Sequence, residues 1–186
     1  MKISEIRAAP VDLTPRPTTV PRVPRQATDG FVSPMRRYNE YRRADWSTPW
    51  KRTAVVVTAA DGTYGLGFTN HAGPVCEIVN GHFVQLLVGQ DATATEKHWD
   101  VLRRSSAPYG SAGLASYAIS AVDIALWDLK GKLFGRPVYE LLGGPQKERI
   151  RCYASATDTS YGLENSLAWF LELGFKAVKL FLPSGA

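Results

Sequence analysis

Residues 114–134, LASYAISAVDIALWDLKGKLF, carry the strongest periodic signal in the sequence. Large apolar side chains recur there every three or four positions, the spacing of a helix that is buried along one face: Ile119, Val122, Leu126, Leu129 and Leu133. The small residues Ala118, Ala121 and Ala125 would let a neighbouring element approach closely. Gly135 and Pro137 follow as a stop signal. The pattern predicts a long helix in the core of a domain.

The residues before this helix predict a small antiparallel sheet. β-Branched residues indicate a first strand over residues 2–13. Residues 53–58, TAVVVT, predict a second strand, and the Asp61-Gly62 turn leads into a third over residues 63–69. A loop rich in Pro and Arg separates the first two strands over residues 14–49. A loop of that length is usually functional and often a lid.

Two more helices are predicted between the sheet and the long helix. Gly73-Pro74 starts the first, with Pro at a favoured position, and apolar residues continue one face through Leu86. Asn80-Gly81 weakens the middle of this helix. The stretch Thr93-Ala94-Thr95-Glu96 fits a capping box and opens the second helix, which runs through Leu102.

The C-terminal part of the chain has a different pattern. Residues 149–154 predict a strand, apolar residues over 163–171 mark a helix closed by Gly174, and residues 177–182 predict a second strand. A strand, a helix and a strand joined by short links form a βαβ unit, whose strands are parallel. Two parallel strands cannot bury themselves alone, so we expect the sequence to stop inside a larger parallel fold.

Composition favours an ordinary globular protein over a membrane or secreted one. The most apolar run, residues 83–88, is far shorter than the roughly 20 residues that cross a bilayer. Cys76 and Cys152 lie far apart, in no metal-ligand spacing, so we expect packed, reduced thiols and a cytoplasmic protein. Much of the net charge of +5 comes from residues 22–52. Such a basic segment can attract a carboxylate or a nucleic-acid backbone.

Two stretches carry a long and specific resemblance. Residues 120–132, SAVDIALWDLKGK, and residues 135–144, GRPVYELLGG, resemble the mandelate racemase and muconate lactonizing enzyme branch of the enolase superfamily. Within that branch, residues 33–41, SPMRRYNEY, resemble the L-rhamnonate dehydratase group, which acts on sugar acids.

The resemblance implies a fold in two parts. An α+β capping domain is expected over residues 1–144, with residues 14–49 as its lid. The first βαβ unit of a TIM-like (β/α)7β catalytic barrel is expected over residues 145–186, so that the chain stops within the barrel. The family also implies a homo-oligomer with a small-molecule substrate, and neither a membrane nor a nucleic-acid partner.

The implied activity is the metal-dependent dehydration of a sugar acid, with an L-rhamnonate-like substrate. A base removes the proton beside the carboxylate, and an acid expels the hydroxyl on the next carbon, which gives a 2-keto-3-deoxy acid. Mg²⁺ is the implied cofactor, because concentrated positive charge stabilises the dianion that forms, and its ligands are expected beyond Ala186. A racemase or cycloisomerase of the same superfamily is the alternative.

Lys179 is the predicted catalytic residue. It lies near the carboxyl end of the second predicted barrel strand, at the face where barrel active sites lie. Racemases and cycloisomerases of the family carry Lys-x-Lys there, whereas this chain has Lys179-Leu180-Phe181. The resemblance therefore implies a base on a later strand, a His with an Asp partner. The alternative role of Lys179 is a charge at the edge of the strand.

Three further residues are predicted to bind the substrate. Arg43 lies where rhamnonate dehydratases carry a lid arginine, which can hold a carboxylate in a two-pronged geometry. Arg42, or a purely solvated arginine, is the alternative. Asn70 and His71 follow the third strand, where the second capping loop of the family covers the substrate. His71 is the first histidine of the chain, so the histidine that the group carries earlier in its lid has no counterpart.

Other conspicuous residues are given no chemistry. Asp123 and Asp128 are five positions apart, which is about 140° around a helix, so they do not share a metal ion. With Trp127, they are expected to dock the cap on the barrel. The aromatic residues among the arginines of residues 22–52 leave a non-catalytic or single-stranded nucleic-acid-binding protein as a further alternative, without a known motif to support it.

Overall fold

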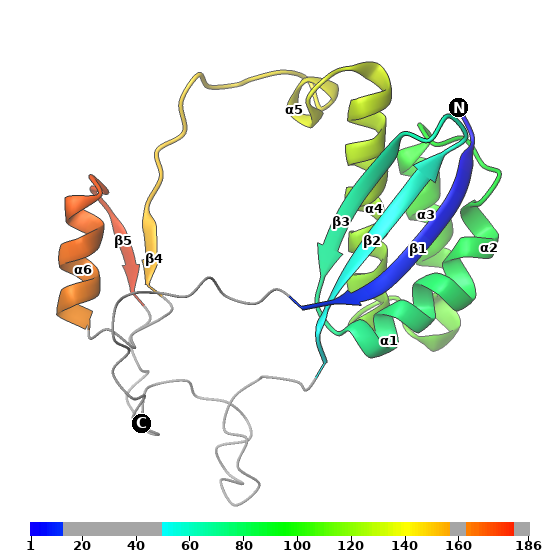
Figure 1. The fold of residues 1–186 in the computed structure, drawn as a ribbon, viewed down its shortest axis with the longest axis horizontal. Coiled ribbons are helices and arrows are strands. Elements are labelled where there is room, and N and C mark those ends of the chain that lie inside the picture. Colours follow the sequence, from blue (N-terminus) through cyan, green and yellow to red (C-terminus); the bar gives the residue numbers. More distant parts are fainter. Residues whose placement is uncertain (13–49, 157–162, 181–186) are drawn as a thin grey trace, which may run out of the picture. The chain divides into compact units, whose positions relative to one another are not determined.

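The computed structural model describes residues 1–12, 50–156 and 163–180. These residues belong to two compact units. The first comprises residues 1–12 and 50–146, and the second comprises residues 147–156 and 163–180. The first unit has an α+β fold, with helices packed on a β-sheet, and the second contains two strands and one helix. Figure 1 shows both units.

A three-stranded antiparallel sheet forms one layer of the first unit, in the order β1 (Ile3–Val11), β2 (Arg52–Ala59) and β3 (Tyr64–Thr69). Every second residue of β2 is buried, which is the period of a strand with one covered face. Between β2 and β3, the Asp61 carboxylate accepts the Thr63 N–H at 2.9 Å, and Gly62 adopts a φ of 87°. The three strands and their tight turn confirm the sequence prediction.

Helices cover one face of this sheet (Figure 1). In chain order they are α1 (Ala72–Glu77), the π-helical segment η2 (Ile78–Phe83), α2 (Val84–Leu87), α3 (Thr95–Ser105), the 3₁₀ turn η3 (Ala107–Tyr109), α4 (Leu114–Phe134) and α5 (Val138–Leu141). Both layers contribute buried side chains to one core, among them Val55, Val57, Phe83, Leu102 and Leu126. α4 has its predicted bounds and ends at Gly135, which adopts the left-handed conformation common at a helix C-terminus.

The predicted capping box is wrong. α3 begins at Thr95, and Ala94 precedes it without a side-chain capping bond. Thr93 instead donates from its N–H and from its hydroxyl to the Asp91 carboxylate, both at 3.0 Å. The hydroxyl that a capping box needs is therefore used in the turn before the helix. The short helix α5 has no counterpart in the prediction, because its four residues give no periodic pattern.

The first helical run changes its winding where the sequence predicts a weak point. η2 is π-helical, whereas α1 and α2 on either side are α-helical. Within it, Asn80 donates from Nδ2 to the Ala8 carbonyl at 2.9 Å and accepts the Ala8 N–H on Oδ1 at 2.8 Å. A side-chain amide thus pairs with β1 as a neighbouring strand would, and it closes the outer edge of β1 at this residue.

The other edge of the sheet is closed by α4. The Asp128 carboxylate accepts the Leu66 N–H at 2.8 Å and pairs with the Lys132 ammonium at 2.7 Å. Lys132 also donates to the Tyr64 carbonyl at 2.9 Å and lies over the Tyr64 ring. Both edge strands therefore bond to helical side chains, which blocks the addition of another strand at these positions.

Two glycines let α4 lie directly on the backbone of β3. An added Cβ at Gly65 would overlap the carbonyl oxygen of Ala125, and one at Gly67 would overlap that of Ala121. Both alanines are fully buried. The small residues predicted to allow a close approach do so against strand backbone, where only glycine fits.

The second unit is a βαβ unit. β4 (Ala154–Ala156) and β5 (Val178–Leu180) pair in parallel, and α6 (Leu163–Glu172) lies between them in the chain. The parallel pairing confirms the prediction, but the predicted extent of the first strand is wrong. Residues 149–153 are not strand, because β5 pairs only with residues from Ala154 onward. Within the described residues, no helix of either unit is long and apolar enough to cross a membrane.

Because α4 lies directly on the backbone of β3, two glycine-to-alanine substitutions are expected to differ in their effect on thermal stability. Gly67→Ala is expected to destabilise the protein by roughly 1–3 kcal/mol, because the new methyl group forces the helix away from the strand. In Gly81→Ala, the control, no atom lies within 4 Å of the added Cβ, and alanine is the better helix former. Thermal unfolding of the full-length variants should give a lower Tm for Gly67→Ala alone. An unchanged Tm for this variant would contradict the close contact.

Candidate functional site

The predicted loop residues Asn70 and His71 join β3 to α1, and backbone bonds fix their position. The Ala72 N–H donates to the Lys51 carbonyl at 3.0 Å. The buried Thr53 hydroxyl donates to the Asn70 carbonyl at 3.5 Å. The link is therefore anchored to the start of β2, and the exposed Asn70 has a defined place at this end of the sheet.

His71 adopts an uncommon backbone conformation. Its φ of 63° and ψ of 51° lie in the left-handed region, and it is the only non-glycine residue with positive φ in the described part of the chain. Histidine tolerates this region better than most residues, at a cost on the order of 1–3 kcal/mol. Such strain persists only where surrounding contacts hold the residue, and it is concentrated at functional sites.

Two aromatic rings pack against His71. The ring centroids of Trp50 and Tyr117 lie 5.7 Å and 4.6 Å from that of the imidazole, and both rings meet it edge to face. Gly73 leaves room for this arrangement, because an added Cβ would lie 3.3 Å from the Trp50 indole. Trp50 precedes β2 and Tyr117 lies in the first turn of α4, so three distant segments meet. Trp50, His71 and Tyr117 together form the aromatic cluster.

The aromatic cluster combines exposed ring surface with hydrogen-bonding groups. Trp50 and Tyr117 are 44% and 40% exposed, so part of each ring remains open to a ligand. The ring faces can contact C–H groups, while the imidazole, the phenol and the Asn70 amide offer hydrogen-bond donors and acceptors. An apolar surface with a few fixed polar groups is the usual composition of a small-molecule site.

Lys179 lies on the other unit. It is the middle residue of β5, opposite Ser155 of β4, and it is exposed. Leu180 follows it as the last described residue of the strand, on the side toward the carboxyl end, where parallel sheets bind ligands. Asn70 and His71 are thus adjacent in the first unit, whereas Lys179 belongs to the second. Arg43, the remaining predicted site residue, lies outside the described residues, as do Arg42 and Phe181.

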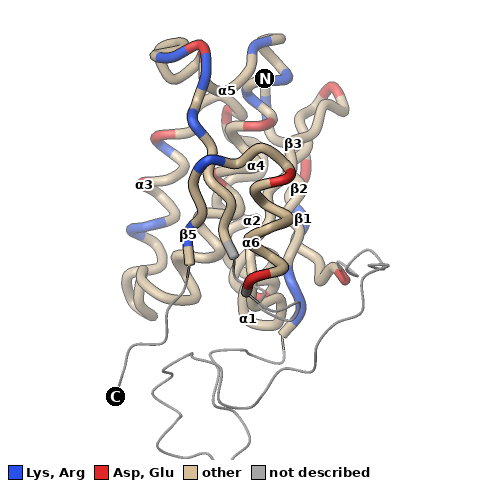
Figure 2. Tube along the Cα trace, turned by 90° about the vertical axis from the view of Figure 1, so that its left-hand side faces the viewer, with Lys and Arg blue, Asp and Glu red and all other residues tan. Residues whose placement is uncertain are grey.

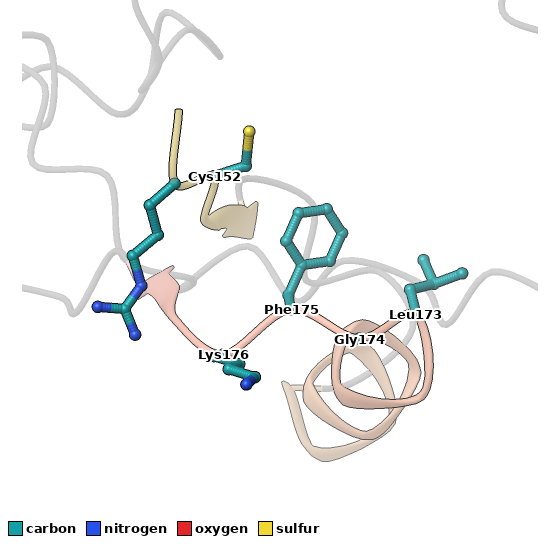
Figure 3. A pocket seen from close by; sticks show the side chains of 6 residues that line it. Cys152, Leu173, Gly174, Phe175 and Lys176 are labelled. Carbon is teal, nitrogen blue, oxygen red and sulfur yellow. The ribbon is translucent and has the colours of Figure 1, made fainter. Parts of the chain in front are cut away.

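A shallow depression of about 300 Å³ lies in the second unit (Figure 3). Arg151 and Cys152 in its lining come before β4, and residues 173–176 come before β5. The depression therefore lies at the amino ends of the two parallel strands. Ligand sites of parallel sheets and barrels lie at the opposite, carboxyl ends. For this reason we do not take the depression as the candidate site.

The described residues do not form a metal site. Within residues 1–12, 50–156 and 163–180, no three His, Cys, Asp or Glu side chains converge closely enough to hold an ion. Asp128 bonds to β3, whereas Asp123 is half-buried near Glu96 of α3, so the two signature carboxylates have separate surroundings. The oxygen-rich ligand set that Mg²⁺ requires is thus not among these side chains.

The two cysteines lie in different surroundings. Burial raises the pKa of the Cys76 thiol in spite of a hydrogen bond with Thr53, and the neighbouring Glu77 charge adds to the rise. A thiol with a raised pKa is poorly ionised at neutral pH and reacts slowly. Cys152 is free and exposed, so the prediction that it is packed is wrong. It precedes the first paired residue of β4, where the described structure provides no covering element.

Tyr117 is absent from the residues predicted for the site, and Trp50 appears there only among the aromatic residues of the basic segment. One sequence signal was available: Tyr117 falls outside the buried stripe of α4, and an exposed tyrosine on a buried helix is a candidate for binding. Its contact with His71 joins residues far apart in the chain, which no local pattern indicates.

Figure 2 shows basic and acidic residues interspersed over the described elements.

Comparison with known proteins gives a consistent family assignment. A family model described as the N-terminal domain of mandelate racemase/muconate lactonizing enzyme matches residues 44–143. An L-rhamnonate dehydratase of Saccharopolyspora erythraea is 39% identical over 160 residues, which are 84% of this chain and 39% of that protein.

Solved structures also resemble the chain, among them the following two. The 3,6-anhydro-D-galactonate cycloisomerase of Zobellia galactanivorans is 36% identical, with a TM-score of 0.64 over 69% of this chain and 36% of that one. The rhamnonate dehydratase of Gibberella zeae complexed with Mg is 29% identical, with a TM-score of 0.69 over 83% of this chain and 39% of that one. The chain thus spans about two fifths of the length of these relatives.

The surroundings of Asp123 predict a pH-dependent effect on stability. Burial raises the pKa of its carboxyl above the ordinary value, and the Glu96 charge raises it further. The folded protein therefore holds this proton more tightly than the unfolded chain does. The resulting stability is fully present below the ordinary pKa of an aspartate and is lost as the pH rises through the raised pKa.

Asp123→Asn is accordingly expected to raise Tm at pH 7, and the gain should disappear below about pH 4. Asp100→Asn is the control, because Asp100 forms an exposed ion pair with Arg104 whose loss should lower Tm only slightly. Thermal unfolding of the full-length protein between pH 4 and pH 8 measures both effects. A lower Tm of Asp123→Asn at pH 7 would contradict the expectation and show that the carboxylate has a favourable contact.

Proposed function

Because the chain belongs to the mandelate racemase/muconate lactonizing enzyme family of the enolase superfamily, we propose that the full-length protein dehydrates a sugar acid to a 2-keto-3-deoxy acid. The observation that carries the proposal is the 39% identity to an L-rhamnonate dehydratase over 84% of the chain. An L-rhamnonate-like acid is the proposed substrate, and the enzyme is a hydro-lyase.

The two units have different roles in this proposal. The first is the α+β capping domain of the family, since the matching model spans β2 to α5. The second is the first βαβ unit of the catalytic barrel. Its parallel strand pair supports this role, because a parallel pair needs further strands and covering helices to become buried.

The reaction breaks two bonds on neighbouring carbons. A base takes the proton from the carbon beside the carboxylate, and the electron pair left behind forms an enolic double bond. The hydroxyl on the next carbon takes a proton and leaves as water, and the enol then becomes the ketone. Negative charge develops on the carboxylate oxygens, so cations placed there lower the barrier. Mg²⁺ is the proposed cofactor, as the Mg complex of the Gibberella zeae enzyme supports, with ligands outside the described residues.

The residues of this chain have four roles in the proposal. The Lys179 ammonium, on β5 near its carboxyl end, stabilises the charge that develops on the substrate carboxylate. Asn70 and His71 bind the sugar hydroxyls, and the open faces of Trp50 and Tyr117 contact the carbon chain. Arg43 holds the substrate from the lid.

A cycloisomerase is the second candidate. The 36% identity to the 3,6-anhydro-D-galactonate cycloisomerase favours it, over a shorter part of the chain than the match to the dehydratase. Both reactions begin with the removal of a proton beside a carboxylate, so the same residues serve either one. The product distinguishes them, because the dehydratase alone releases water.

A screen of acid sugars tests the proposal directly. Full-length protein with Mg²⁺ should convert at least one aldonic acid, L-rhamnonate being the first to try, into a 2-keto-3-deoxy acid that semicarbazide detects. Removal of the metal with EDTA should abolish the product, and added Mg²⁺ should restore it. An isomer without loss of water would favour the cycloisomerase instead. No turnover of any acid sugar in the presence of Mg²⁺ would refute both.

Lys179→Met tests the role of the strand lysine. It should lower kcat and kcat/KM by about the same factor, roughly 10²–10⁴, because the charge acts mainly in the transition state. Lys176→Met is the matched control, since Lys176 is exposed and precedes β5, and it should keep normal kinetics. Equal kinetics for the two variants on the identified substrate would show that Lys179 is only a surface charge.

A further inference from the structure

One face of the three-stranded sheet has no covering layer within the first unit. Helices cover one side of the sheet (Figure 1). The buried β2 residues face these helices, and the alternate residues of each strand lie on the opposite side. Tyr64 and Phe68 on this face are 54% and 47% exposed. The strand register sets the side chains of the outer face in three rows: Glu5, Thr58 and Tyr64; Arg7, Val56 and Leu66; and Ala9, Ala54 and Phe68.

The edges of the sheet are closed, in contrast to its outer face. Asn80 occupies both backbone groups of Ala8 on the β1 edge. Asp128 and Lys132 occupy Leu66 and Tyr64 on the β3 edge. A partner that adds a strand is therefore blocked at these positions, whereas a partner that packs face to face is not.

Two opposite charges on the outer face are spaced so that they can form ion pairs with the same two residues of a second copy. Glu5 and Arg7 are exposed, and neither side chain has a hydrogen bond or ion pair among the residues that the structure describes. They lie on the same side of β1, two residues and about 6.7 Å apart. Consider two copies whose sheets stack on this face, related by a two-fold axis that lies between the sheets. If the axis runs perpendicular to the strands, midway between the row of Glu5 and the row of Arg7, then Glu5 of each copy lies opposite Arg7 of the other. A symmetric interface requires such self-complementarity.

We propose that the outer face of the sheet is a contact surface between two copies of this chain. The sheets stack face to face, about 10 Å apart, around that two-fold axis. Two Glu5–Arg7 ion pairs form at one side of the interface. Toward the β3 side, Tyr64 of each copy packs on Leu66 of the other, and the Val56 side chains become buried between the sheets.

The size of the face limits the strength of the contact. Three strands about 4.8 Å apart and three rows about 6.7 Å apart cover an area on the order of 300 Å². A stable protein interface buries roughly 800 Å² on each partner. The sheet contact alone is therefore weak and depends on protein concentration, or it is one part of a larger assembly interface.

Charge reversal tests the proposal in the full-length protein. Glu5→Arg and Arg7→Glu should each weaken self-association by about tenfold or more, because like charges then face each other across the axis. The double variant, with both reversals, should associate as the wild type does. Glu77→Arg and Lys97→Glu are the controls, because both residues are exposed on the helical side of the unit. Sedimentation velocity over a range of concentrations measures the association.

Mixing the two single variants gives the sharpest result. A tagged Glu5→Arg protein should capture untagged Arg7→Glu protein, since opposite charges then meet at both positions, and it should capture little untagged Glu5→Arg protein. Equal capture of the two untagged proteins would overturn the proposal. So would a wild type that stays monomeric at every concentration. Single variants with a lower Tm but unchanged association would show that the face is covered by another part of the same chain, which also overturns it.

Discussion

The contact of α4 with the bare backbone of β3 is the constraint on which the first unit depends. Gly65 and Gly67 leave no side chains between the strand and the helix, so the two backbones approach more closely than a layer of side chains would allow. Asp128 and Lys132, on the same helix, reach the edge of β3 because of this approach. The closed sheet edge therefore follows from two glycines.

The same contact positions the candidate site. Tyr117 lies in the first turn of α4, and His71 follows the end of β3, so a helix held against this strand brings the two rings to 4.6 Å. Trp50 reaches His71 from the start of β2, which the sheet register fixes relative to β3. The strained backbone of His71 is thus held from two sides by elements that are themselves fixed by the core.

Local patterns were sufficient to predict most of the elements but few of the contacts between them. The bounds of α4 and the β2–β3 turn follow from helical spacing and from Asp61-Gly62, signals contained in a few neighbouring residues. The start of α3 was mispredicted because Asp91 competes for the Thr93 hydroxyl. Asn70, His71 and Lys179 were selected by family resemblance. The left-handed φ of His71 and its contact with Tyr117 were beyond prediction, because they depend on a helix more than forty positions away.

Two residues at or near the first helical run have an unfavourable local conformation, and a contact with another element stabilises each of them. His71 takes a strained conformation immediately before α1, against Trp50 and Tyr117. Asn80 lies in a π-helical segment of the same run, against the backbone of β1. A sequence that favoured the helix alone would have neither feature, so tertiary contacts must offset their cost. The run from α1 to α2 therefore begins next to the aromatic cluster at His71 and contacts the β1 edge of the sheet at Asn80.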